Sequence, residues 1–176
     1  MGTNDASFIS KDKERTSPEQ FETNLTTLIE WFISEQQAKV YVATLLPLND
    51  ERYENWRCSE FARKSKEPRR LDEKHRQYSN IIRKVASRKA DAGVFLVDIA
   101  KKIDQCVCAK SSSLEEILGE DGLHGRQKAY EILWGLMKQP VAKAKELGPN
   151  YPDWTLAPEL APQVGMAPPK SQLSKG

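Results

Sequence analysis

The sequence has few cysteines, and their arrangement excludes two kinds of stabilising site. Cys58, Cys106 and Cys108 are odd in number and form no C-x-x-C pair. Structural zinc sites use closely spaced cysteine and histidine pairs, and disulfide-rich domains use an even set of cysteines. We therefore expect reduced cysteines in a chain that needs neither a zinc ion nor a disulfide framework.

The sequence also lacks a long hydrophobic run and an excess of one charge. Of its 176 residues, 39% are hydrophobic and 30% are charged, and the formal net charge is +2. No apolar run approaches the ~20 residues that a membrane-spanning helix needs. Basic and acidic residues alternate, and the one basic stretch, Arg63–Arg70, is expected to be a solvated loop. These features predict one soluble globular domain with no transmembrane segment and no nucleic-acid partner.

The first residues carry no targeting signal. Met1-Gly2-Thr3-Asn4-Asp5 lacks the basic flank and the apolar core of a signal peptide. The compartment is therefore left unspecified, with the cytoplasm as the default expectation unless a segment upstream of Met1 carries a signal.

Helical and strand patterns alternate in the first part of the chain. Ser17 before Pro18, with Gln20 three residues after the cap, is typical of a helix start, and apolar spacing continues this helix to about Gln36. Continuous apolar runs at Val40–Leu46 and Gly93–Asp98 predict strands buried on both sides, with a helix from Arg70 to Arg88 between them. The residues expected on the buried sides of the two helices are Phe21, Leu25, Leu28, Ile29 and Phe32, then Leu71, Tyr78, Ile81, Ile82 and Val85. This order predicts a parallel sheet.

The remaining segments are less regular. Residues 49–68 show no sustained period and are expected to form a long surface loop, with one helical turn within it left open. Ser113 and Glu116 form a capping-box pattern that predicts a short helix ending at Leu118-Gly119. A last helix is expected from about Gly125 to Lys138, limited by Pro140, with an extension of a turn or two to Leu147 left open. Its inward residues are Ala129, Ile132, Leu133, Leu136 and Met137.

The composition changes after this helix. Prolines are frequent from Pro149 onward, and little apolar periodicity remains, so a disordered tail is expected. The predicted organisation is one domain over residues 1–140, followed by a short helical extension and a proline-rich tail over residues 141–176.

Two short motifs stand out against this pattern. Gly2-Thr3-Asn4-Asp5 precedes the first helix and strand, and Asp121-Gly122-Leu123-His124 lies between the short helix and the last helix. In this order, residues 1–138 resemble the carboxyl-terminal portion of the SGNH (GDSL-type) ester hydrolases. The resemblance implies an α/β fold, a three-layer α/β/α sandwich with a mostly parallel, flavodoxin-like sheet, whose first strands are missing. Met1 would fall where the third strand of that fold ends.

The resemblance also implies roles for single residues. Asp121 and His124 would be the acid and the base of a Ser-His-Asp triad, and Asn4 would donate its amide to the oxyanion hole, with Gly2 letting the backbone turn closely. The family's nucleophile belongs to an earlier Gly-Asp-Ser block, which this sequence does not contain. The implied activity is hydrolysis of a small-molecule, lipid or sugar ester, without a metal or another cofactor, by a serine that lies outside this chain.

Each of these residues also has a purely structural interpretation. His124 would then be an ordinary histidine at a helix start, Asp121 an N-cap, and Gly2 and Asn4 part of a disordered terminus. His75 is expected on the exposed side of its helix. Ser7, Ser10 and Ser111–Ser113 are expected in loops or caps, so none of them is a credible nucleophile.

Two other functions stay open beside the esterase. One is a non-catalytic, truncated pseudoenzyme or remnant of the same fold that binds a partner, and the other is a helical interaction module. Loss of the first strands would expose the flank of the strand at Val40–Leu46, because an unpaired edge invites strand pairing. A partner or the missing N-terminal segment is therefore expected to cover this edge.

Overall fold

Parallel strands β3 (Val40–Ala43) and β4 (Val94–Val97) confirm the predicted strand-helix-strand unit. Val40 pairs with Val94, and the register continues to Ala43 opposite Val97. The computed structural model describes residues 2–6, 8–10, 13–14, 16–35, 39–61 and 71–146. The other elements, in chain order, are β1 (Phe8–Ser10), β2 (Lys13–Glu14), α1 (Pro18–Ser34), α2 (Asp50–Phe61), α3 (Leu71–Arg88), a 3₁₀ helix (Ala90–Ala92), α4 (Ile99–Cys108), α5 (Leu114–Ile117) and α6 (Gln127–Glu146).

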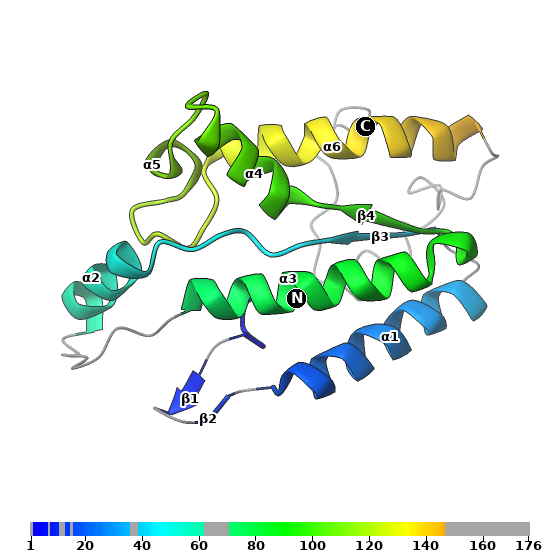
Figure 1. The fold of residues 1–176 in the computed structure, drawn as a ribbon, viewed down its shortest axis with the longest axis horizontal. Helices are drawn as coiled ribbons and strands as arrows, with labels where there is room; N and C mark the ends of the chain where they lie inside the picture. Colours follow the sequence, from blue (N-terminus) through cyan, green and yellow to red (C-terminus); the bar gives the residue numbers. More distant parts are fainter. Residues whose placement is uncertain are drawn as a thin grey trace, which may run out of the picture. The chain divides into compact units, whose positions relative to one another are not determined.

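Helices lie on both sides of the β3–β4 sheet. Helices α1 and α3 pack against each other, α3 contacts both strands and α1 contacts β3, while α6 contacts β4 and α4 (Figure 1). Figure 1 draws α4 and α6 across the sheet from α1 and α3. The chain is therefore a mixed α/β protein, mostly helical, whose parallel sheet has two strands within the described residues.

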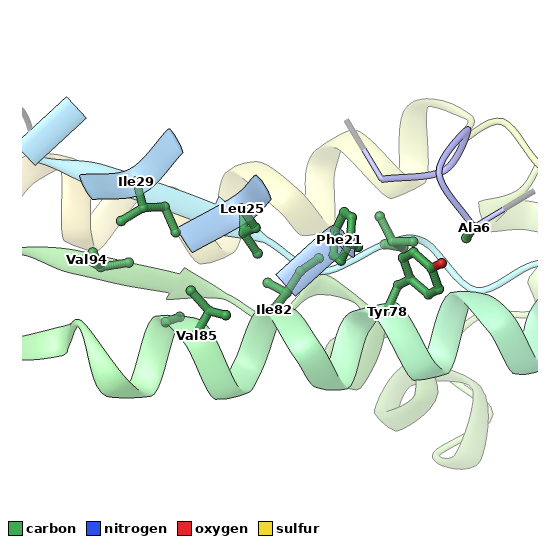
Figure 2. Packing of buried hydrophobic residues seen from close by; sticks show 10 residues of the cluster. Ala6, Phe21, Leu25, Ile29, Tyr78, Ile82, Val85 and Val94 are labelled. Carbon is green, nitrogen blue, oxygen red and sulfur yellow. The ribbon is translucent and has the colours of Figure 1, made fainter. Parts of the chain in front are cut away.

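The larger hydrophobic core joins α1 to α3. Phe21, Leu25 and Ile29 recur at helical spacing on α1, and all three are buried against α3 (Figure 2). The rings of Phe21 and Tyr78 lie 4.7 Å apart between their centroids. The start of α1 is as predicted, because the Ser17 hydroxyl accepts a hydrogen bond from the Gln20 N–H at 3.2 Å and Pro18 opens the helix.

A second core joins α4, α5 and α6. Ile103, Ile117 and Leu118 are fully buried there. The predicted capping box of α5 is confirmed, because the Ser113 hydroxyl accepts from the Glu116 N–H and the Glu116 carboxylate accepts from the Ser113 N–H. Helix α4 was not predicted, and its N-cap is Asp98, whose carboxylate accepts from the Lys101 N–H.

The prediction of a long loop over residues 49–68 is wrong for its first part, which forms α2. Asn49 lies directly before this helix, and its side chain accepts from the Arg52 N–H at 3.0 Å. Arg57 of α2 is buried, at 8% exposed, so a charged residue takes a position on the inner side of this helix. The sequence of α2 therefore shows no hydrophobic period although the segment is helical. Residues 62–70, which include most of the predicted basic loop, lie outside the described residues.

The prediction that both strands are buried on each side is also wrong. Residues of β3 are half-buried or exposed, and Phe95 and Leu96 of β4 are 36% and 41% exposed. Two strands present little area for helices to cover, so apolar composition did not guarantee burial. Phe32, predicted on the buried side of α1, is likewise 38% exposed.

Three smaller differences concern other elements. The hairpin of β1 and β2 was not predicted, and it places Ser10 in a strand rather than in a loop. Helix α6 begins at Gln127 and continues through Pro140 to Glu146, so this proline does not end the helix. The tail predicted from Pro149 onward lies outside the described residues, and so does Ser7.

Candidate functional site

The Asp121–His124 motif forms a closed turn between α5 and α6. Leu118 and Gly125 make an antiparallel bridge at its base, and the Gly119 N–H donates to the His124 carbonyl at 2.6 Å. Inside the turn, the Gly122 N–H donates to the Gly119 carbonyl at 3.0 Å. The motif is therefore held by its own backbone and by the ends of two helices.

Gly122 is required at its position for two reasons. Its φ is +67°, in the left-handed region that side chains disfavour. A Cβ atom there would also lie 2.8 Å from the Asn49 carbonyl oxygen and 2.8 Å from the Cβ of Arg52. The close approach lets the Asn49 N–H donate to the Gly122 carbonyl at 2.9 Å.

Asp121 uses its two carboxylate oxygens differently. Oδ1 accepts from the backbone N–H groups of Leu123 and His124, both at 3.0 Å, and Oδ2 contacts Nδ1 of the His124 ring. Partial burial raises the pKa of Asp121, but the hydrogen bonds from the His124 ring and from the two N–H groups outweigh it, so the net pKa is lowered. The carboxylate is therefore charged near neutral pH and fixes the ring beside it.

The two side chains differ in exposure. The Asp121 side chain is 13% exposed, whereas the His124 side chain is 79% exposed. Within the described part of the chain, Asp121 is the only hydrogen-bond partner of the His124 ring. A carboxylate that accepts from Nδ1–H fixes the neutral tautomer with Nε2 unprotonated, which can take a proton from a neighbouring hydroxyl.

The Gly2–Asp5 motif also forms a turn. The Ala6 N–H donates to the Gly2 carbonyl at 2.9 Å, and the Gly2 N–H donates to Oδ2 of Asp5 at 3.0 Å. The Thr16 hydroxyl donates to the other oxygen of Asp5 at 3.0 Å. Gly2 is buried with a φ of +105°, and Asn4 is exposed in the same turn.

One segment contacts both turns. We call Thr44–Asn49, which joins β3 to α2, the bridging segment. A Cβ on Gly2 would lie 2.6 Å from Cδ2 of Leu45, and Asn49 is hydrogen-bonded to Gly122 at the other end of the segment. Both motifs therefore lie beside the chain that leaves the carboxyl end of β3, the end of a parallel strand at which α/β proteins commonly place their sites.

Three side chains of α3 hold the bridging segment, and none of them is predicted from the sequence to belong to the site. The Asp72 carboxylate accepts from the Leu48 N–H at 3.0 Å, and the Ser79 hydroxyl accepts from the Leu45 N–H at 3.1 Å. Between them, Nδ1 of His75 lies 2.9 Å from the Leu46 carbonyl oxygen. We call Asp72, His75 and Ser79 the α3 ladder.

The prediction that His75 is exposed is wrong, because this residue is 3% exposed. The signal that could have revealed this is its spacing. Leu71, His75, Tyr78, Ile82 and Val85 follow one another at intervals of four and three residues, the spacing of one helix face, and all five are buried. Because histidine is polar, the sequence pattern predicted an exposed position for His75 although its spacing matches the buried residues.

Ser111, Ser112 and Ser113 bond to backbone groups at the end of α4 and the start of α5. Ser111 and Ser112 donate to the backbone carbonyls of Cys106 and Ser111, and Ser113 caps α5, so the predicted loop or cap role of these three is confirmed. Among the described residues, no group of three or more His, Cys, Asp or Glu side chains could hold a metal ion.

Comparison with protein-family models, with curated protein sequences and with solved structures gave no match to this chain. None of the helices in the described ranges combines the length and the apolar character needed to cross a membrane.

Proposed function

We propose that this chain supplies the acid-base pair and part of the oxyanion hole of an SGNH-type carboxylic ester hydrolase, whose nucleophilic serine lies outside the chain. The observation that carries the proposal is the Asp121–His124 pair, in which a partly buried carboxylate holds Nδ1 and the rest of the ring is exposed. A histidine that only begins a helix needs no such partner.

In the proposed reaction, Nε2 of His124 takes the proton of the serine hydroxyl as that oxygen attacks the ester carbonyl carbon. The charge on Asp121 stabilises the imidazolium that forms, and the same proton then passes to the leaving alcohol. Water repeats the cycle on the acyl-enzyme. Typical losses on disabling such a base are several orders of magnitude in kcat.

Asn4 is proposed as a donor to the oxyanion. It is exposed in a turn that is fixed by Asp5 and seated against Leu45, next to the bridging segment that also reaches Gly122. A preorganised amide donor of this kind contributes about 3 kcal/mol to transition-state stabilisation. We further propose that the parallel β3–β4 pair is part of a wider, three-layer α/β/α sandwich, and that an ester of a small molecule, lipid or sugar is the substrate.

The decisive test is the transcript or genomic sequence upstream of Met1, read in frame for a strand that ends in Gly-Asp-Ser. If the block is there, the longer protein is expected to hydrolyse p-nitrophenyl acetate and to react with a fluorophosphonate probe, while the present chain alone does neither. In the longer protein, His124→Ala should lower kcat by about 10⁴-fold, and Glu120→Gln, on the exposed neighbour of Asp121, should leave kcat unchanged.

A stop codon in that frame would contradict the proposal, and so would full activity of the His124→Ala variant. The second candidate function, a non-catalytic remnant that binds a partner, would then take its place. The exposure of Phe95 and Leu96 on β4 favours that candidate.

A further inference from the structure

We propose that His75 is a positioning residue for the Asp121–His124 pair and acts through the bridging segment. The inference rests on the proposed function for its catalytic meaning, while the mechanical coupling can be measured without a substrate. Among the described residues, His75 is hydrogen-bonded to Leu46 and to neither Asp121 nor His124, so its effect has to pass through Leu46 and the residues beside it.

The coupling follows one short path. His75 and its two ladder neighbours hold three backbone groups of the bridging segment, at Leu45, Leu46 and Leu48. One residue later, Asn49 donates its N–H to Gly122 and accepts the Tyr53 N–H with its own carbonyl. Gly122 lies between Asp121 and His124, so a shift of the bridging segment moves the centre of the turn.

The opposite side of the segment leaves little freedom to absorb such a shift. Cδ2 of Leu45 lies 2.6 Å from where a Cβ of Gly2 would be, and Cδ1 of Leu46 lies 3.2 Å from where a Cβ of Gly125 would be. Leu46 also packs against the core of α4, α5 and α6. Close packing transmits a displacement because there is no void to take it up.

The chemistry of the His75 bond is well defined. A carbonyl oxygen can only accept, so Nδ1 of His75 carries the hydrogen. Burial lowers the pKa of His75 and outweighs the Leu46 carbonyl and the negative charges of Asp72 and Asp50, which raise it. The neutral ring with its hydrogen on Nδ1 therefore holds the segment near neutral pH.

Amide hydrogen exchange of the whole chain tests the coupling. His75→Leu removes the hydrogen-bond donor to the Leu46 carbonyl. Exchange at the N–H groups of Asn49, Leu123 and His124 should then accelerate about tenfold. This acceleration is measured relative to any change in the most slowly exchanging amides. His75→Asn, whose side-chain amide can donate from nearly the same position as Nδ1, should restore most of the protection.

Two variants separate positioning from general destabilisation. Val85→Ala in the α1–α3 core should lower the protection of the amides throughout the chain. The exchange rates at Asn49, Leu123 and His124, relative to those of the most slowly exchanging amides, should stay unchanged. Ser79→Ala removes another hydrogen bond of the ladder with almost no change in side-chain volume, and it should accelerate the same amides if His75→Leu does not fold.

Unchanged protection at these three amides in both ladder variants, or the same local acceleration in Val85→Ala, would overturn the inference and leave His75 as a core residue. This result would not bear on the serine sought upstream of Met1. Conversely, a missing Gly-Asp-Ser block would remove the proposed function while the measured coupling would stand.

Discussion

At the scale of single residues, the candidate site depends on the carboxylate of Asp121 and on a glycine, Gly122, at the next position. Asp121 folds its own turn with Oδ1 and holds His124 with Oδ2, so the structural and the catalytic interpretations of this residue describe different oxygens of one group. Gly122 then lets the Asn49 backbone approach the turn. The shape of the turn is therefore set by residue identity at these two positions.

Gly122→Ala tests this dependence. We expect a loss of about 1–3 kcal/mol in the free energy of unfolding, because the alanine would be strained at positive φ and would press on the Asn49 carbonyl. Chemical denaturation monitored by circular dichroism measures the loss. Gly135→Ala is the matched control, because nothing lies within 4 Å of its added Cβ in α6, and it should stabilise the chain by about 0.5–1 kcal/mol. Equal effects at both glycines would refute the argument.

At the scale of elements, Asp98 ties together four of them. It follows β4 and caps α4, and its two oxygens accept from Nε and Nη2 of Arg83 on α3, both at 2.8 Å. The Thr44 hydroxyl, just after β3, donates to Oδ1 at 3.2 Å and accepts from the Ala100 N–H at 3.0 Å. The side chains of Asp98 and Arg83 are 19% and 32% exposed, so water screens this pair only in part.

Asp98→Ala should therefore destabilise the chain by about 2–3 kcal/mol, because it removes a helix cap and leaves a partly buried guanidinium without its carboxylate. Asp104→Ala is the control. Asp104 pairs with Arg76 at 3.1 Å, but these side chains are 43% and 54% exposed, and such a surface pair contributes less than about 1 kcal/mol. Thermal unfolding of both variants measures the difference, and a loss as large in Asp104→Ala would count against burial as the cause.

The same pair links stability to pH. The hydrogen bonds from Arg83 hold the pKa of Asp98 below its ordinary value, so the folded state binds this proton less readily than the unfolded chain. The contribution of ionised Asp98 to the free energy of unfolding is fully present above the pKa of this residue in the unfolded chain, about 3.9. It is lost as the pH falls through the lower pKa of the folded state. Asp98→Ala should accordingly show a smaller loss of stability over this acidic range than the wild-type chain.

At the scale of the whole molecule, the described sheet is smaller than its apolar content suggests. Tyr41 and Phe95 stack across the two strands with their ring centroids 5.1 Å apart, while Leu96 beside them is 41% exposed. A short parallel pair with exposed apolar side chains is a surface on which strands of other chains can pair.

We therefore expect the isolated chain to associate with itself as its concentration rises. Leu96→Lys should weaken this association, because a charge on an exposed strand opposes pairing, and it should change the free energy of unfolding little. Sedimentation velocity over a concentration series measures the effect. Trp31→Lys, at a residue of α1 that is 47% exposed, is the control for general surface hydrophobicity. If it weakens association as much as Leu96→Lys, the strands are not the cause.

The sequence by itself determined the features that depend on local chemistry. The Ser17 and Ser113 caps, the apolar rows of α1 and α3, and the order of the parallel pair are all readable from neighbouring residues, because caps and helical spacing act over one or two turns of chain. The Asp121 and His124 spacing belongs to the same class, since a tight turn between them suffices to bring the carboxylate to the ring.

Only the tertiary structure decided what depends on partners far away in the chain. His75 is buried because the bridging segment supplies its acceptor 29 residues earlier, and α2 carries a charged residue, Arg57, on its buried side although it has no apolar period. Phe95 and Leu96 are exposed because two strands give the helices little area to cover. Burial and long-range hydrogen bonds are properties of the assembled chain, so sequence patterns could name the candidate residues of the site but not the α3 ladder that holds the bridging segment.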